Sequence, residues 1–490
     1  MAGVETGTIT TDIPARMDRL PWARWHWMVV IGLGTVWILD GLEVTIVGSM
    51  SEALKPNDTG LGLSSSDVGL AGAMYVAGAC VGALLFGQLT DRFGRKKLFL
   101  LTLGVYTVAT VLTAFSMNPV WYFACRFLTG MGIGGEYAAI NSAIDELIPA
   151  KYRGRVDVAI NGSFWVGAAL GSLLTIPLLD PNVVDPSWGW RSAFGLGAVL
   201  AIGILVVRRH VPESPRWLFI HEREEEAEEI VRDIERTVSE ESGKELHGVD
   251  RTITIRQRKT ISLPLIAKTV FTMYPRRTIL CFSLFVGQAF LYNAFFFTYG
   301  DTLSTFLDVG QTGWYLAIFA ASNFIGALAL SPLFDSIGRV RMIAGTYILS
   351  GVLLAVAGLM LGSLSAVTLT VFGAVIFFFA SAGASAAYLT ASEVFPMETR
   401  ALCIAFFYAI GTAVGGITGP LLFGKLIDAA DAITDIAPGY FLGAALMVAG
   451  GIVEIFLGVK AEGQSLEDIA QPLTAEDQPS EGEQRERSHA

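Results

Sequence analysis

Twelve long apolar stretches run through this 490-residue chain, and they leave few alternatives for its fold. A bilayer core about 30 Å thick is crossed by about 20 apolar residues in an α-helix, so a stretch of this length predicts a membrane span. The predicted spans cover residues 27–50, 67–89, 98–117, 119–145, 156–178, 190–209, 277–300, 312–334, 342–361, 365–391, 401–425 and 438–459. Charged residues make up only 16% of the chain, whereas a soluble domain contains about 25%. The apolar excess is therefore expected to face lipid.

A long polar segment separates the first six predicted spans from the last six. This arrangement predicts an all-α membrane protein whose twelve transmembrane helices form two pseudo-symmetric six-helix bundles. The predicted parts are a cytoplasmic N-terminal segment over residues 1–26, bundles over 27–209 and 276–460, a cytoplasmic loop with amphipathic helices over 210–275, and a cytoplasmic tail over 461–490.

Within the polar loop, residues 221–236 carry apolar side chains three and four positions apart. These side chains are Ala227, Ile230, Val231 and Ile234. Their spacing predicts an amphipathic helix that lies against the cytoplasmic face of the membrane. Residues 237–250 are polar and contain glycine, which predicts a linker, and the composition after Gln471 is typical of a disordered tail.

A charged motif occurs twice, once in each predicted half. Residues 87–97 read G-Q-L-T-D-R-F-G-R-K-K and residues 331–341 read S-P-L-F-D-S-I-G-R-V-R, so Asp, Gly and Arg recur at the same spacing. A second motif, with Glu, Pro and Arg at identical spacing, begins at Glu146 and recurs at Glu393. The two halves therefore carry the same charged loops on one side of the membrane.

Lysine and arginine in the short loops predict the orientation, because cytoplasmic loops retain positive charge. Nearly all loop cations fall on one side of the predicted spans, and that side also holds both termini and the central loop. Both termini are therefore expected in the cytoplasm, with the protein in the plasma membrane. The net charge of −11 is spread among the polar segments and gives no indication of nucleic-acid binding.

The acids and arginines of the repeated motifs predict a cytoplasmic gate. Acidic residues at helix ends and arginines in the adjoining loops can form ion pairs between the halves when this side is closed, and separate when it opens. The first copy comprises Asp91, Arg92, Arg95, Glu146, Arg153 and Arg155, and the second comprises Asp335, Arg339, Glu393 and Arg400. Anchoring by positive charge alone is the alternative, and it accounts for the arginines but not for the acids.

Three charged residues stand out among those inside predicted spans, where an ionised side chain is costly unless it has a partner or a water-filled cavity. They are Asp40 and Glu43 in the first span and Arg126 in the fourth. At 1.5 Å per residue, Glu43 lies about 10 Å below the outer end of its span, and Arg126 lies about as deep in its own. Glu43 is therefore predicted to be a proton site whose pKa responds to Arg126 and to bound solute, with Asp40 able to share that role. A static ion pair between the two helices is the alternative.

The remaining reactive residue types do not indicate an enzyme. The four cysteines, Cys80, Cys125, Cys281 and Cys403, lie inside predicted spans without paired spacing, which predicts buried thiols rather than a metal or redox site. The sequence shows no nucleophile–base pair, phosphate-binding loop or metal-ligand cluster. We therefore expect no enzymatic activity, no metal and no cofactor.

Jointly, these motifs resemble those of the major facilitator superfamily. The resemblance rests on the doubled G-x-L-x-D-R-x-G-R pattern, on Arg126 within R-F-L-T-G-M-G-I-G-G, on E-L-I-P-A-K-Y-R-G-R at 146–155 and on P-E-S-P-R-W-L at 212–218. It covers residues from about 27 to 470. Within the superfamily the chain is similar to the sugar porters and to related organic-ion and metabolite carriers.

The resemblance implies a central cavity between the two bundles and transport by alternating access. In proton-coupled sugar porters an acid follows Gly-Tyr in the first span, and Gly41-Leu42-Glu43 matches that position here. Arg126 is then implied as the partner of that acid. Glu213 and Arg216 are implied as further members of the cytoplasmic gate.

Amide side chains are the first candidates for a substrate site. Sugar porters carry a Q-Q-x-x-G-x-N pattern in the seventh span, of which Gln288 and Asn293 remain here. Such amides can hydrogen-bond a neutral polyol or a carboxylate, and hydrogen bonding between helices is the alternative. The fifth span lacks the usual Gln and offers Asn161 and Trp165.

The aromatic residues favour a substrate other than a hexose. The tenth span has Tyr388 in the region where sugar porters have Gly-Pro and Trp. If Tyr292 and Tyr388 face the cavity beside Arg126, an aromatic or otherwise apolar carboxylate suits the site better than a sugar. Asp40-Gly41-Leu42-Glu43 also resembles the Asp-Gly-x-Asp of aromatic-acid proton symporters.

The sequence thus predicts a secondary active transporter that moves a small organic solute, a sugar, an organic acid or a related metabolite, by alternating access with proton symport. The alternatives are a uniporter with the same cavity and a transporter-like solute sensor. Proton flux separates symport from uniport, and net solute flux separates both from a sensor. The expected partners are the solute, protons and the lipid bilayer, and the protein is expected to function as a monomer.

Overall fold

The computed structural model describes residues 5–208, 223–246, 253–258, 269–395 and 400–460, together with Glu213, Pro215, Leu218 and Gly248. Within these residues, twelve long helices occupy the predicted spans: α2 (Arg24–Ser49), α4 (Ser65–Phe93), α5 (Arg95–Ala114), α6 (Pro119–Leu147), α7 (Ala150–Leu178), α8 (Pro186–Arg208), α12 (Pro275–Leu307), α13 (Gly313–Ser336), α14 (Arg339–Met360), α15 (Ala366–Glu393), α16 (Arg400–Ala429) and α17 (Ala437–Leu457). The shorter elements are β1 (Glu5–Thr11), α1 (Ile13–Asp18), α3 (Ser51–Leu54), α10 (Glu224–Ser242), β2 (Ile253–Arg258), the π-helical turn η1 (Thr269–Met273) and the 3₁₀ turns η2 (Leu361–Ser363) and η3 (Ile433–Ile436).

The long helices are apolar on the surface as well as inside. Nine helices in the described part of the chain are long and apolar enough by themselves to cross a membrane. The side chains of Val120 and Leu359, each 76% exposed, show that large apolar groups face outward, where lipid rather than water stabilises them. The predicted all-α membrane fold with two six-helix bundles is confirmed.

The two bundles repeat one set of helix pairings. In the first half α2 packs against α7, α4 against α6 and α5 against α8. In the second half the helices in the same positions pair in the same way, with α12 against α16, α13 against α15 and α14 against α17. This repetition is the structural form of the doubled sequence motif.

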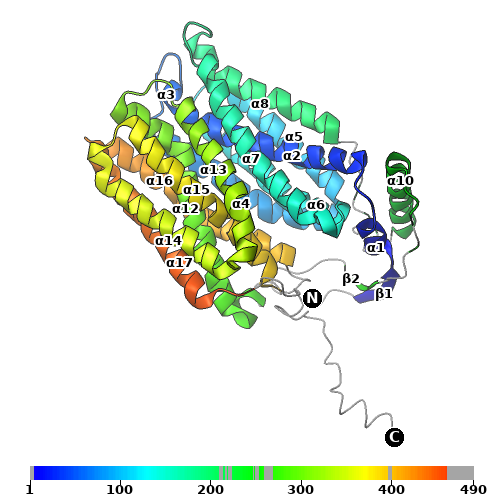
Figure 1. Ribbon diagram of the computed structural model, residues 1–490. Helices are drawn as coiled ribbons and strands as arrows, with labels where there is room; N and C mark the ends of the chain where they lie inside the picture. Colours follow the sequence, from blue (N-terminus) through cyan, green and yellow to red (C-terminus); the bar gives the residue numbers. More distant parts are fainter. Residues whose placement is uncertain are drawn as a thin grey trace.

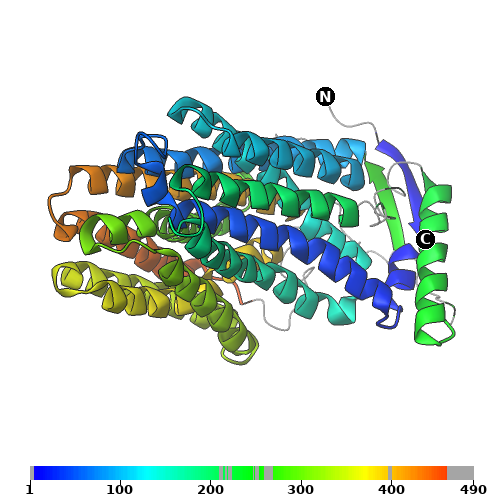
Figure 2. The same ribbon diagram turned by 90° about the horizontal axis from the view of Figure 1, so that it is seen from above.

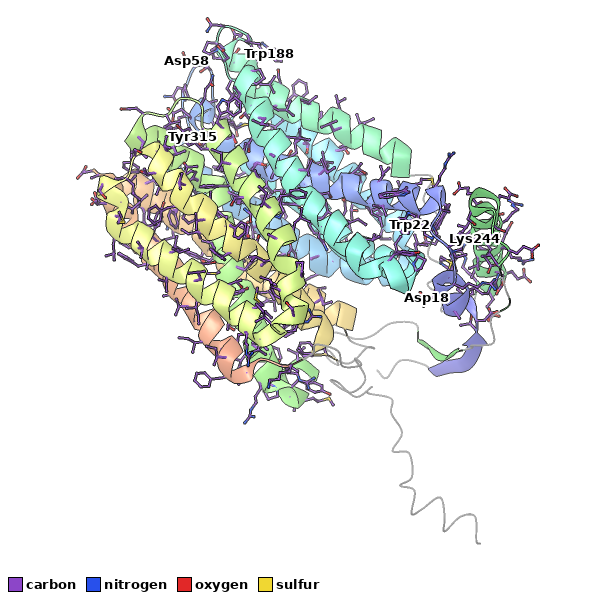
Figure 3. All side chains as sticks on the ribbon, viewed as in Figure 1. Asp18, Trp22, Asp58, Trp188, Lys244 and Tyr315 are labelled. Atoms are coloured by element: carbon purple, nitrogen blue, oxygen red, sulfur yellow. The ribbon has the colours of Figure 1, made fainter. Side chains whose placement is uncertain are left out.

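The most extensive helix contacts between the halves are those of α2 with α12, α4 with α16 and α7 with α13. In Figure 1 the bundles lie together near α3 and diverge away from it. We call this the α3 end of the molecule and the opposite end, beyond which α10 lies, the α10 end. Asp58 and Trp188 mark the α3 end in Figure 3, whereas Trp22 and Lys244 mark the α10 end.

At the α3 end the halves approach backbone to backbone. A Cβ atom on Gly48 of α2 would lie 1.9 Å from the carbonyl oxygen of Phe296 in α12, and one on Gly69 of α4 would lie 2.3 Å from that of Pro420 in α16. Only glycine permits these contacts, because any side chain would force the helices apart.

Polar contacts across the halves lie at the same end. Asp428 of α16 accepts hydrogen bonds from the backbone N–H groups of Ser65 and Ser66, at 2.8 and 2.9 Å, where α4 begins. Lys55 forms an ion pair with the buried Asp301 of α12. Between described residues, the hydrogen bonds and ion pairs that join the halves are all found at the α3 end. The structure is therefore closed at this end.

The predicted amphipathic helix exists as α10 and is longer than expected. It buries Ala227, Val231 and Ile234, as predicted, and also Val238. The interpretation of residues 237–242 as linker is wrong, because Val238 continues the apolar face and the helix ends only at Gly243, whose φ of 63° suits glycine.

The N-terminal segment docks on α10. Arg16 of α1 binds Glu228 and Glu235, at 2.8 and 2.7 Å, and Arg19 also pairs with Glu235. Partial burial alone would raise the pKa of Glu235, but the hydrogen bonds from both arginines lower it. β1 and β2 form an antiparallel ribbon beside these helices, which the sequence analysis did not predict (Figure 2).

Candidate functional site

A fully buried ion pair lies in the core of the first bundle. Arg126 of α6 donates from Nη1 to Oε1 of Glu43 in α2, and both side chains are 0% exposed. Tyr106 of α5 donates to the other carboxylate oxygen at 3.4 Å. Glu43 and Arg126 were predicted from the sequence to lie at the same depth, and in the structure they are in contact.

Aromatic rings surround the guanidinium. Its carbon lies 4.8 Å from the ring centre of Tyr75 and 5.7 Å from that of Phe194. Arg126 Nε and Nη2 are buried without a hydrogen-bond partner among the described residues. The guanidinium contacts one carboxylate and two ring faces, so N–H groups remain that can donate to another acceptor.

Asp40 has a different partner. Its carboxylate, 2% exposed, accepts a hydrogen bond from the hydroxyl of Tyr75 at 2.6 Å. Because Asp40 and Glu43 lie on neighbouring turns of α2, the two acids and the arginine form one buried group, with Tyr75 between Asp40 and Arg126. We call these four residues the charged cluster.

Chemically, the charged cluster can exchange a proton. It holds two carboxylates and one guanidinium, and each ionised carboxylate at membrane depth is costly. A proton on either acid lowers that cost. No redox or nucleophilic step follows from this arrangement.

An aromatic cluster spans the two halves beside this group. Trp165 of α7 lies 5.5 Å from Tyr292 and 5.6 Å from Phe296 of α12, measured between ring centres. Tyr292 also packs on Phe377 of α15 and donates its hydroxyl to Asn323 at 2.6 Å. Trp165 is partly exposed, so part of its side chain remains accessible.

The predicted amides, which lie on α7 and α12, are partly exposed. Asn293 donates to the carbonyl of Ala289 at 2.9 Å, which leaves its own oxygen free of described partners. Asn161 of α7 and Gln288 of α12 are also partly exposed. Exposed amides deep inside long apolar helices indicate access for water or solute.

Tyr388 of α15 links the aromatic side to the charged cluster. Its ring packs on Phe285 and Tyr408, at 5.0 and 6.1 Å, and it lies within electrostatic reach of Asp40. Tyr292 and Tyr388 do not supply the rings beside Arg126, since those belong to Tyr75 and Phe194. Whether Tyr292 and Tyr388 face a cavity beside Arg126, the condition for an aromatic carboxylate site, stays a prediction.

Most residues of the predicted gate have side chains outside what the structure describes: Asp91, Arg92, Arg95, Glu146, Arg153, Arg155, Arg216, Asp335, Glu393 and Arg400. Glu213 is described, and it accepts the backbone N–H of Lys96 at 3.2 Å, at the start of α5. Arg339 is described as partly buried and has an interaction partner. The gate stays a prediction.

Several polar residues of the site were not singled out from the sequence. Tyr75, Tyr106 and Asn323 lie in apolar spans, where a hydroxyl or amide with a fixed partner is the only signal, and that partner becomes visible only in three dimensions. The four cysteines are buried thiols, as predicted, and none forms a disulfide with another described residue. No group of side chains suited to a metal is found among the described residues.

Comparison with known proteins gives consistent results. A family model described as sugar (and other) transporter matches residues 25–473. The niacin transporter NiaP of Acinetobacter baylyi is 28% identical, covering 94% of this chain and 99% of that protein. The gallate transporter of Pseudomonas putida is 25% identical over 85% and 89%, and the 4-hydroxybenzoate transporter PcaK of Pseudomonas aeruginosa is 23% identical over 90% and 95%.

Solved structures share the fold. The inward-open xylose transporter XylE from Escherichia coli superposes with a TM-score of 0.67 at 19% identity, covering 91% of this chain and 98% of that one. Its partially occluded inward-open form gives a TM-score of 0.68 at 17% identity, over 90% and 100%.

Proposed function

We infer that this chain, which belongs to the family of sugar and other transporters in the major facilitator superfamily, is a proton symporter for small aromatic carboxylates. It is a membrane transporter and not an enzyme, as the sequence predicts, because the matched family and the relatives compared are transporters. The observation that carries the proposal is the charged cluster, which holds two acids and one arginine at membrane depth.

Charge balance supports coupling to protons. An ionised substrate bound near the charged cluster would add a further negative charge in a low-dielectric interior. A proton on Asp40 or Glu43 offsets that charge, so substrate and proton favour each other's binding. By linkage the coupling is reciprocal, as symport requires.

The substrate class follows from the aromatic cluster. Trp165, Tyr292 and Tyr388 offer ring faces with an amide and hydroxyls nearby, which favours a flat apolar ring with one polar edge over a hexose. Niacin, gallate and 4-hydroxybenzoate, the solutes named for relatives, each combine an aromatic ring with a carboxylate. We assign Gln288, Asn293 and Asn161 to the polar contacts of the same site.

Alternating access supplies the transport step. The contacts at the α3 end support a state open toward the α10 end, and the bundles over residues 27–209 and 276–460 would rock about the central site. Loop cations such as Lys96, Lys97 and Arg341 favour the cytoplasm for the α10 end and both termini. We place the protein in the plasma membrane as a functional monomer.

The test is substrate-driven proton movement in proteoliposomes. Nicotinate, 4-hydroxybenzoate, gallate and benzoate are compared with xylose and glucose, and internal and external pH are recorded. The variant is Glu43→Gln, and the matched control is Glu52→Gln, an exposed acid at the α3 end whose side chain is 55% exposed.

We expect an aromatic carboxylate, and no hexose, to drive proton uptake in the wild type and in Glu52→Gln but not in Glu43→Gln. Solute that equilibrates without proton movement would make the protein a facilitator and Glu43 a structural partner of Arg126. Proton movement with a hexose alone would overturn the substrate class.

A further inference from the structure

We propose that Tyr75 is a positioning residue that couples the protonation of Asp40 to the contact between the two halves. This inference rests on the proposed function, because it assumes that Asp40 takes part in proton binding. It goes beyond that function by assigning a role to a residue that is neither charged nor in the aromatic cluster.

The side chain of Tyr75 makes three contacts at once. Its hydroxyl donates to Asp40 at 2.6 Å, and its ring lies 4.8 Å below the guanidinium carbon of Arg126. The same ring lies 5.8 Å from the ring of Phe297, which belongs to α12 in the other half. Tyr75 is only 4% exposed, so these contacts define its position.

Phe297 belongs to the closed α3 end. It is fully buried, and its Cγ would lie 2.7 Å from a Cβ on Gly72, one turn before Tyr75 on α4. The neighbouring Phe296 carbonyl contacts Gly48. Phe297 therefore sits in a notch of α4, and the wall of that notch is formed by Gly72 and the Tyr75 ring.

The hydroxyl responds to the charge on Asp40. An ionised carboxylate can only accept, so it fixes the tyrosine as donor in a short, charge-assisted hydrogen bond. A protonated Asp40 carries its own donor, and the hydroxyl then becomes an acceptor or turns away. The Arg126 guanidinium attracts the ring face in both cases, so the change falls on the tilt of the ring against Phe297.

The other ionisable groups that interact electrostatically with Asp40 or with its partner Tyr75 come from several helices. Glu43 lies on α2 itself, Arg126 on α6, Tyr106 on α5 and Tyr388 on α15. Arg126 is paired with Glu43, whereas Tyr75 is the residue whose hydroxyl reaches Asp40. This separation makes Tyr75 the residue to test.

The test uses Tyr75→Phe, which keeps the ring and removes the hydroxyl. Tyr122→Phe is the matched control, since Tyr122 is also fully buried near Arg126 but its hydroxyl has no hydrogen-bond partner among the described residues. Each full-length variant is reconstituted, and two quantities are measured with 4-hydroxybenzoate: counterflow, which needs no net proton transfer, and proton-driven uptake as a function of pH.

For Tyr75→Phe we expect the pH of half-maximal proton-driven uptake to rise by about one unit, a tenfold change in proton affinity, with counterflow of the same variant as the reference for the amount of active protein. The rise follows because ionised Asp40 loses a donor. Tyr122→Phe should change neither quantity. An unchanged pH profile in Tyr75→Phe, or a shift of equal size in Tyr122→Phe, overturns the inference.

The two proposals fail in different ways. If the wild type moves protons with substrate and Glu43→Gln does not, but Tyr75→Phe behaves as wild type, only the role of Tyr75 is lost. If the wild type moves substrate without protons, both are lost. If Tyr75→Phe does not fold, Tyr75→His is measured in its place, because histidine keeps a ring with a hydrogen-bond donor. A pH profile like that of the wild type supports the inference, whereas a shifted profile contradicts it.

Discussion

The two bundles share their helix pairings but bury different chemistry. In the first, α2 and α6 bury Glu43 and Arg126 as an ion pair. In the second, the corresponding helices α12 and α15 contribute aromatic side chains such as Phe296 and Phe377, and the buried polar contact is the neutral one between Tyr292 and Asn323. The two halves therefore share helix packing although their buried side chains differ.

This difference assigns separate tasks to the halves. The first bundle holds the buried ion pair at which charge can change, while the second offers rings that recognise shape. The described part of the second bundle also buries two acids: Asp301 of α12, which pairs with Lys55 of the first half, and Glu454 of α17, which is 1% exposed and whose Oε2 has no hydrogen-bond partner. The predictions below test whether the division holds.

The largest effect is expected from Arg126→Ala. This change leaves Glu43 buried without a cation, which costs about 3–5 kcal/mol, so the thermal unfolding temperature in detergent should fall and proton-driven uptake should be lost. The double variant Glu43→Gln/Arg126→Ala should recover the unfolding temperature but not the uptake. A single variant as stable as the wild type would show that the pair is not the electrostatic centre of its half.

Asp428→Ala is expected to weaken the contact between α16 and the start of α4, which joins the two halves. Loss of a helix-capping carboxylate costs about 0.5–2 kcal/mol, which should shift the population toward the state open at the α3 end by about two- to thirtyfold. Spin labels at Asp58→Cys and Gln311→Cys would report this as a longer distance. Asp431→Ala, an exposed acid nearby, is the control, and an equal change there would remove Asp428 from the closure.

Trp165→Leu should affect recognition and leave coupling intact. An aromatic contact contributes about 0.5–1.5 kcal/mol beyond the buried area, so KM for an aromatic carboxylate should rise about two- to tenfold. The number of protons moved per solute should stay constant. A changed proton ratio would mean that the aromatic cluster also belongs to the coupling machinery.

The smallest effect is expected from Glu454→Gln. The amide keeps the size of the side chain and removes a buried carboxylate that no described cation compensates, so stability should be equal or higher. Proton stoichiometry and the pH profile of uptake should match the wild type. Lower stoichiometry would place a second proton site in the aromatic half and end the division between the bundles.

The sequence was sufficient for features that depend on length and depth. Apolar stretches of span length gave the twelve helices, and equal depth along α2 and α6 placed Glu43 beside Arg126. Helical spacing gave α10, although its end required Val238 to be read as part of the apolar face.

Features that depend on side-chain direction could not be predicted. Asp40 and Glu43 are close in sequence, yet one binds Tyr75 and the other Arg126, because α4 and α6 reach α2 from different sides. The β1–β2 ribbon joins residues far apart in the chain, and neither strand carries a strong alternating pattern. The position of Tyr388 across from Asp40 likewise depends on how the halves meet.

The contact of Asp428 with the start of α4 also constrains how this sequence can vary. Asp428 accepts the main-chain N–H of Ser65, so most side chains at this position leave the bond in place. One residue type is the exception. Proline is often favoured at the first position of a helix because the N–H it lacks is usually unpaired there, but here that N–H is in use. Proline at this position, which favours the start of most helices, would here remove a hydrogen bond that joins the two halves.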